Sequence, residues 1–125
     1  MDRARFESLV EKVLDALPQD FDQALEEGNI GVMVADRPDP ADLDTMGMSE
    51  RGMTLLGLYH GVPPTRRGIG YSLVLPDNIT IYKEPIERYA RQAGRQVEDV
   101  VTEVVLHEIA HHFGLPDERL RELGY

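Results

Sequence analysis

Residues 97–117 read VEDVVTEVVLHEIAHHFGLPD, and this stretch carries the most informative side chains of the chain. His107, Glu108 and His111 form an H-E-x-x-H pattern. Residues four positions apart lie on one face of an α-helix, so the two imidazoles can bind the same cation. Glu108 lies about 100° around the helix from His107, which lets its carboxylate reach a water beside the ion. The pattern predicts a hydrolase with two neutral metal ligands, an open position and a general base.

The helix that carries this pattern is predicted over residues 96–113. Apolar residues surround the pattern on nearly every face: Val97, Val100, Val101, Val104, Val105, Leu106, Ile109, Ala110 and Phe113. A helix of this kind is expected to be buried, and an unpartnered charge there costs several kcal/mol. The histidines and Glu108 therefore need a partner, and a bound cation supplies one.

Asp117 is the preferred third ligand, because a catalytic zinc ion usually takes three protein ligands and a water. On a continuous helix it would lie about 9 Å beyond His111, which is too far to reach the same ion. Gly114 can adopt the left-handed conformation that ends a helix, and Pro116 prevents the helix from resuming at once. The chain is therefore predicted to turn back and bring Asp117 under the two histidines.

Other roles remain open for the acidic residues. Glu118 and Glu122 are less favoured candidates for the third ligand, because no turn is built to deliver them. Asp117 could instead cap a terminal helical turn over residues 117–123. Glu108 could form a buried ion pair with one of three arginines: Arg66, Arg67 or Arg88.

The sequence gives less information about the roles of the other two histidines, His112 and His60. His112 lies about 40° from Glu108 around the helix. It can orient the base or a substrate oxygen, although a supporting or solvent-facing role is favoured. His60 ends a predicted strand beside Gly61 and is interpreted as part of a turn.

Composition limits the possible classes. The chain has 125 residues, 42% of them hydrophobic, which suits a single domain over residues 1–125. It has no cysteine, so disulfides and thiolate ligands are excluded. Residues 1–10 show no secretory signal, and no apolar run approaches the roughly 20 residues of a membrane span, so a cytoplasmic protein without membrane association is expected. The net charge of −10 repels phosphates and disfavours a nucleic-acid partner.

The remaining segments predict an α+β fold. A helix is expected over residues 3–17, with a helical turn near residues 21–25 and a further helix from Pro85 to about residue 93. Strands are expected over residues 30–35 (buried), 54–60, 71–75 and 79–82, and loops over residues 36–52 and 61–70. The predicted fold is a small mixed sheet packed against helices, one of which is the buried active-site helix.

Residues 107–117 resemble H-E-x-x-H-x-x-G-x-x-D, the aspartate form of the extended metzincin zinc signature. The chain resembles more closely the small bacterial minimal zincin metallopeptidases, which end in H-E-I-A-H-H-F-G, an acidic residue and E-L-G-Y or E-L-G-W. Residues 55–59 (LLGLY), 75–77 (LPD) and 81–87 (IYKEPIE) are also similar to that family. The resemblance covers residues 6–125.

This resemblance implies a zincin-like fold, with His107, His111 and Asp117 as zinc ligands and Glu108 as the general base. The predicted function is zinc-dependent hydrolysis of peptide bonds, with a peptide or protein as substrate and Zn²⁺ as cofactor. Glu108 takes a proton from the attacking water and returns it to the leaving amine. Residues 79–82 are a candidate strand edge for an extended peptide. Candidate oxyanion donors are Tyr82, Tyr125, His112 and Arg67.

Two other classes of protein are alternatives to a metallopeptidase. A zinc-dependent endoribonuclease of the rRNA-maturation type has similar histidine spacing, but Glu108, Asp117 and the acidic charge argue against it. A non-catalytic, zinc-stabilised interaction domain is the second alternative. The substrate, the cleavage preference and the oligomeric state are not predicted.

Overall fold

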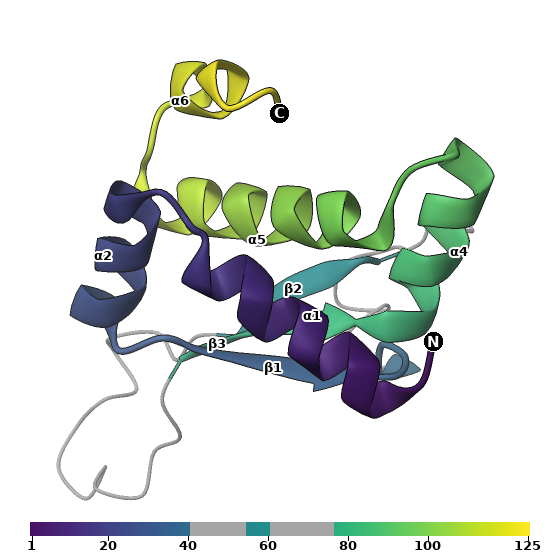
Figure 1. The fold of residues 1–125 in the computed structure, drawn as a ribbon. Coiled ribbons are helices and arrows are strands. Elements are labelled where there is room, and N and C mark those ends of the chain that lie inside the picture. The colour runs from purple at the N-terminus through teal and green to yellow at the C-terminus, as the bar shows by residue number, and fades with distance from the viewer. Residues whose placement is uncertain (41–54, 61–76) are drawn as a thin grey trace, which may run out of the picture.

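The computed structural model describes residues 1–40, 55–60 and 77–125, and Figure 1 shows their arrangement. The predicted α+β class is confirmed. The predicted strand over residues 71–75 and most of the two predicted loops lie outside the described residues. The elements, in chain order, are α1 (Arg3–Asp15), α2 (Gln19–Gly28), β1 (Gly31–Ala35), β2 (Gly57–His60), β3 (Asn78–Tyr82), α4 (Lys83–Ala93), α5 (Val97–Phe113) and α6 (Asp117–Glu122).

The three described strands form a mixed sheet in the order β1-β3-β2. β1 runs parallel to β3, and β2 runs antiparallel to it. Because β3 has a strand on each side, the prediction that residues 79–82 offer an edge to a peptide is wrong. The strand predicted over residues 30–35 is present as β1, but the prediction that it is buried is wrong for one of its two faces. Strand side chains alternate, so Val32 and Val34 pack on the core whereas Met33 is 57% exposed.

The two N-terminal helices depart slightly from the prediction. α1 begins after Asp2, whose side chain accepts a hydrogen bond from the Arg5 backbone N–H at 2.8 Å. It ends at Asp15 rather than at residue 17. α2 is a full helix instead of a single turn, and Asn29, the residue after its last residue Gly28, is in the left-handed conformation. Both helices contribute aromatic or aliphatic side chains to the core: Phe6, Val10, Val13 and Phe21.

α5 is the central helix, because it contacts all the other described helices and the strands β2 and β3. The predicted burial of this helix is confirmed for the side of α5 that faces the core. Its buried residues are Val100, Val101, Val105, Leu106, Ile109 and Ala110. His107, His111 and His112 are exposed, so the expectation that they lie in apolar surroundings is wrong. Three of the apolar residues counted for that expectation, Val97, Val104 and Phe113, are only partly buried.

The end of α5 follows the sequence prediction. Gly114 is in the left-handed conformation (φ 68°, ψ 23°), and its backbone N–H donates to the Ala110 carbonyl. After this turn, α6 runs back in the opposite direction alongside α5 (Figure 1). Arg119 of α6 donates to the Asp20 carboxylate of α2 at 2.9 and 3.2 Å, which fixes the returning segment. Among the described residues, no helix combines the length and apolar character needed to cross a membrane.

Candidate active site

Two neighbouring stripes of side chains on α5 make up the candidate site. The outer stripe consists of Glu103, His107 and His111, and the inner stripe of Val104, Glu108 and His112. Each stripe has a spacing of four residues, which places its members one above the other along the helix.

The outer stripe is open to solvent. The His107 side chain is 49% exposed, and its Nε2 lies 3.9 Å from Oε1 of Glu103. His111 is also exposed. Glu103 forms an ion pair with Arg95, which holds this carboxylate beside the first turn of α5. Both predicted histidine ligands therefore present their rings on an accessible face of the helix.

The inner stripe faces β2. Gly57 pairs with Ile81 and Tyr59 with Ile79, and both isoleucines are fully buried. Alternation along the strand therefore places Gly57 and Tyr59 on the side that packs against α5. A Cβ added to Gly57 would lie 2.5 Å from Cγ1 of Val104. The absence of a side chain at residue 57 is what lets β2 approach the helix this closely.

Glu108 lies in the middle of the inner stripe, and its side chain is 24% exposed. Burial raises the pKa of this carboxyl above its ordinary value. The charge of His111, a hydrogen bond from the Tyr59 backbone N–H and the charge of His60 act in the opposite direction. A carboxylate with a raised pKa is better suited to accept a proton near neutral pH, as a general base must.

His112 contacts both Glu108 and β2. Its Nε2 lies 3.5 Å from Oε2 of Glu108. Its ring stacks on the ring of Tyr59, with centroids 4.1 Å apart and planes 19° apart. Burial, and then the neighbouring His111, lower the pKa of His112 and favour the neutral imidazole. Of the roles left open by the sequence, these contacts support the one in which His112 orients the base.

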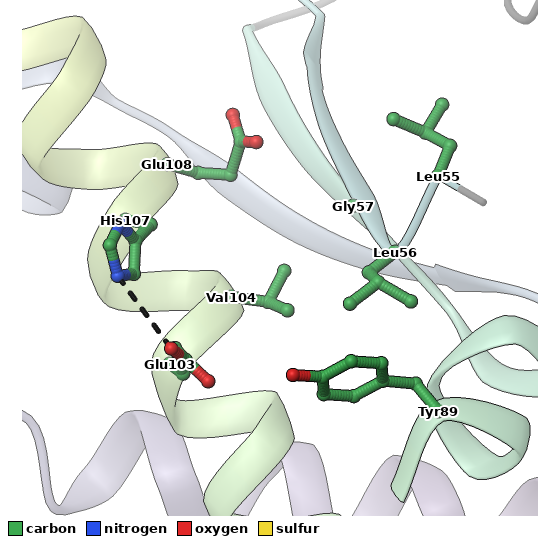
Figure 2. A pocket seen from close by; sticks show the side chains of 8 residues that line it. All are labelled: Leu55, Leu56, Gly57, Tyr89, Glu103, Val104, His107 and Glu108. Atoms are coloured by element: carbon green, nitrogen blue, oxygen red, sulfur yellow. Dashed lines mark ion pairs between the residues drawn. The ribbon is translucent and has the colours of Figure 1, made fainter. Parts of the chain in front are cut away.

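A pocket of about 410 Å³ opens beside the two stripes, between α5, α4 and the start of β2. In Figure 2, Glu108 and Val104 project from α5 toward β2, and Tyr89 points from α4 toward α5. The walls of the pocket are mainly apolar, and its acidic groups, Glu103 and Glu108, come from α5. The lining residues are Leu55, Leu56, Gly57, Tyr89, Glu103, Val104, His107 and Glu108.

Asp117 is the first residue of α6 and is exposed. The alternative in which it caps α6 is wrong, because the N-cap is Pro116 and no side chain makes a capping bond there. Two imidazoles and a carboxylate fit the ligand chemistry of zinc. Within residues 1–40, 55–60 and 77–125, however, no three His, Asp or Glu side chains are gathered closely enough to hold an ion. The ligand set of His107, His111 and Asp117 therefore stays a prediction.

The structure also bears on the weaker candidates. Glu122 forms an ion pair with Arg119 of the same helix at 3.3 Å. Tyr82 is only 2% exposed, so its side chain belongs to the core and is a poor oxyanion donor. His60 is the last residue of β2, and its Nδ1 lies 3.2 Å from the Thr80 hydroxyl. Arg66 and Arg67 lie outside the described residues.

Sequence reasoning missed two residues of the site, Tyr59 and Tyr89. Tyr59 stacks on His112, and Tyr89 lines the pocket beside Glu103. Tyr59 ends the LLGLY segment that resembles the family, but neither this segment nor the position of Tyr89 relates the tyrosines to the histidines by spacing. The available signal is alternation in β2, which places Tyr59 on the same face as Gly57 and becomes informative once the sheet is known to pack on α5.

The zincin-like metallopeptidase family matches residues 28–125, which span β1 to the C-terminal residue and include both stripes of α5. A comparison with curated proteins gives no match. The small mixed sheet, the active-site helix and the glycine turn agree with a zincin-like fold. The chain belongs to the zincin-like metallopeptidase family.

Proposed function

We propose that the protein is a zinc-dependent metallopeptidase in which His107, His111 and Asp117 hold the ion and Glu108 is the general base. The observation that carries the proposal is the position of Glu108. Its carboxylate is largely buried, points toward β2 and lies at a pocket beside His107. Membership of the zincin-like family and the chemistry of the donor set support the same function.

Hydrolysis of a peptide bond requires activation of the carbonyl group and transfer of a proton from water to the leaving nitrogen. Bound zinc would act as a Lewis acid toward the amide carbonyl and the attacking water. Glu108 accepts one proton from that water as its oxygen bonds to the carbonyl carbon. When the C–N bond breaks, Glu108 returns the proton to the leaving nitrogen, so that an acid and an amine are formed and the carboxylate is regenerated.

The pocket favours peptides with an apolar side chain next to the scissile bond. Leu55, Leu56 and Val104 form apolar walls in a volume of about 410 Å³, directly beside Glu108. A side chain the size of leucine or phenylalanine would be removed from water there, which stabilises binding by about 1.5–3 kcal/mol.

The absence of cysteine is compatible with a cytoplasmic site of action, which is part of the proposal.

The test uses the zinc-loaded wild type and Glu108→Gln on a peptide library, with cleavage products identified by mass spectrometry. The wild type is expected to cleave beside apolar residues, and a zinc chelator is expected to stop it. Glu108→Gln is expected to keep its zinc and lose about 10²–10⁴-fold in rate. Equal cleavage by the two proteins would refute the role of Glu108. A zinc-loaded wild type that cleaves nothing would overturn the peptidase proposal in favour of a zinc-stabilised interaction domain.

A further inference from the structure

The contact between β2 and the C-terminal half of α5 holds His112, which is neither a proposed zinc ligand nor the proposed general base. His112 is 36% exposed and is positioned by a ring and a carboxylate from different elements. Its face lies on Tyr59 of β2, and its edge nitrogen lies 3.5 Å from the Glu108 carboxylate.

Tyr59 is itself fixed from more than one direction. Its hydroxyl donates to Oδ2 of Asp77 at 2.9 Å, next to the start of β3. Its ring forms a T-shaped pair with the ring of Phe113, with centroids 6.2 Å apart and planes 77° apart. The ring that supports His112 is therefore held by contacts with the residue before β3 and with the end of α5.

We propose that Tyr59 and His112 form a clamp that fixes the orientation of the Glu108 carboxylate, so that His112 is a positioning residue for the general base. This inference rests on the proposed function. A glutamate side chain has several rotatable bonds, and a general base acts well only when its oxygen is aimed at the proton that it accepts. The clamp restricts that freedom from one side, while the Tyr59 backbone N–H meets the same carboxylate from the strand.

Two contacts between β2 and α5 lie on either side of Glu108. Gly57 sets the close approach of β2 to α5 at Val104, the first residue of the inner stripe. Tyr59 and His112 make the contact at the far end of the same stripe. Glu108 lies between these two contacts, so a single strand–helix interface controls both the pocket wall and the direction of the base.

The test compares four variants of the zinc-loaded protein. His112→Leu removes the nitrogen that faces Glu108, and His112→Gln keeps a polar hydrogen-bonding group of similar reach. Tyr59→Leu removes the ring, and Tyr59→Phe removes only the hydroxyl. His112→Leu and Tyr59→Leu are each expected to lower kcat by about 10–100-fold, with KM and zinc content unchanged. His112→Gln is expected to recover most of the rate, and Tyr59→Phe to lose less than Tyr59→Leu.

A second readout is independent of turnover. In NMR spectra of the wild type, the His112 ring protons are expected to shift upfield, because the ring lies over the face of Tyr59. Tyr59→Leu should abolish this shift, and Tyr59→Phe should retain it. Glu108→Gln should move the same resonances, because the charge 3.5 Å from Nε2 disappears.

Several outcomes would overturn the clamp. These are a normal kcat in His112→Leu, a fall in its zinc content that accounts for the lost rate, or the absence of the upfield shift in the wild type. A wild type that shows the shift and the Glu108 response but cleaves no peptide would refute the peptidase function, and with it the catalytic role of the clamp, while confirming the contacts.

Discussion

The substitution Gly57→Ala tests how closely β2 packs on α5. The new Cβ would lie 2.5 Å from Cγ1 of Val104 and 3.3 Å from the Thr80 carbonyl oxygen. Carbon atoms in contact prefer a separation of about 3.5–4.0 Å, so the shortfall against Val104 is about 1 Å. The Val104 side chain cannot rotate away without a cost in energy, because a β-branched side chain in a helix has one strongly preferred χ1 rotamer. The strand is limited on its other side by the Thr80 oxygen.

We expect Gly57→Ala to lower the free energy of unfolding by about 1–3 kcal/mol, the usual cost of an overpacked contact. The assay is urea unfolding followed by circular dichroism, which gives the midpoint and the slope for each variant. Val104→Ala should relieve the clash. In the double-mutant cycle, Gly57→Ala should cost at least about 1 kcal/mol less on the Val104→Ala background.

Gly31→Ala is the matched control. Gly31 also lies in a strand, but a Cβ there meets nothing within 4 Å. This variant should be as stable as the wild type or slightly more stable, because alanine loses less conformational entropy on folding. If Gly57→Ala and Gly31→Ala behave alike, or if Val104→Ala gives no rescue, then β2 does not pack on α5 as described.

Two further predictions concern the metal and the returning helix. Asp117→Ala should lose most of the zinc that the wild type binds, about one ion per chain by metal analysis, whereas Glu118→Ala should keep it, because Asp117 is the proposed third ligand. Equal zinc loss in both variants would contradict this ligand assignment. The hydrogen bond from Arg119 lowers the pKa of Asp20 below its ordinary value of 3.8. The ionised carboxylate therefore stabilises the fold above that value, and the wild type's advantage over Asp20→Asn should shrink as the pH falls through the lowered pKa. Urea unfolding at about pH 7 and about pH 2.5 measures this gap, and an unchanged gap would contradict the ion pair.

The helical part of the fold is predictable because its signals are local. Pro85 in a first turn, Gly94 after α4 and Gly114 after α5 each specify a helix boundary through backbone conformation. Gly94 and Gly114 both have positive φ, as their positions after periodic segments predict. The H-E-x-x-H pattern is equally local, because the helical period alone relates His107 to His111.

The strand order is not predictable in the same way. Residues 79–82 show the alternation of a half-exposed strand, yet β3 lies between β1 and β2. Which strand becomes central depends on pairings between segments distant in sequence, and the period of two does not encode them. The same limit applies to Tyr59, whose stacking on His112 follows from the packing of β2 against α5 and not from either segment alone.

The exposure of the outer stripe has a related cause. The valines around the motif predict a helix surrounded by apolar side chains, but composition does not say which of them lie at the margin of the core. Val101 and Val105 are fully buried, whereas Val104 is only partly covered. His107 and His111 lie toward this open side, where an ion and a substrate can reach them.

The most direct test of the zinc centre is a crystal structure of the zinc-loaded protein with diffraction data collected at the zinc absorption edge. We predict one anomalous peak, about 2.0–2.2 Å from a nitrogen of His107, a nitrogen of His111 and an oxygen of Asp117. We also predict that Glu108 lies beside this ion without binding it. A peak held by other residues, or Glu108 directly bound in place of Asp117, would contradict the proposed zinc centre.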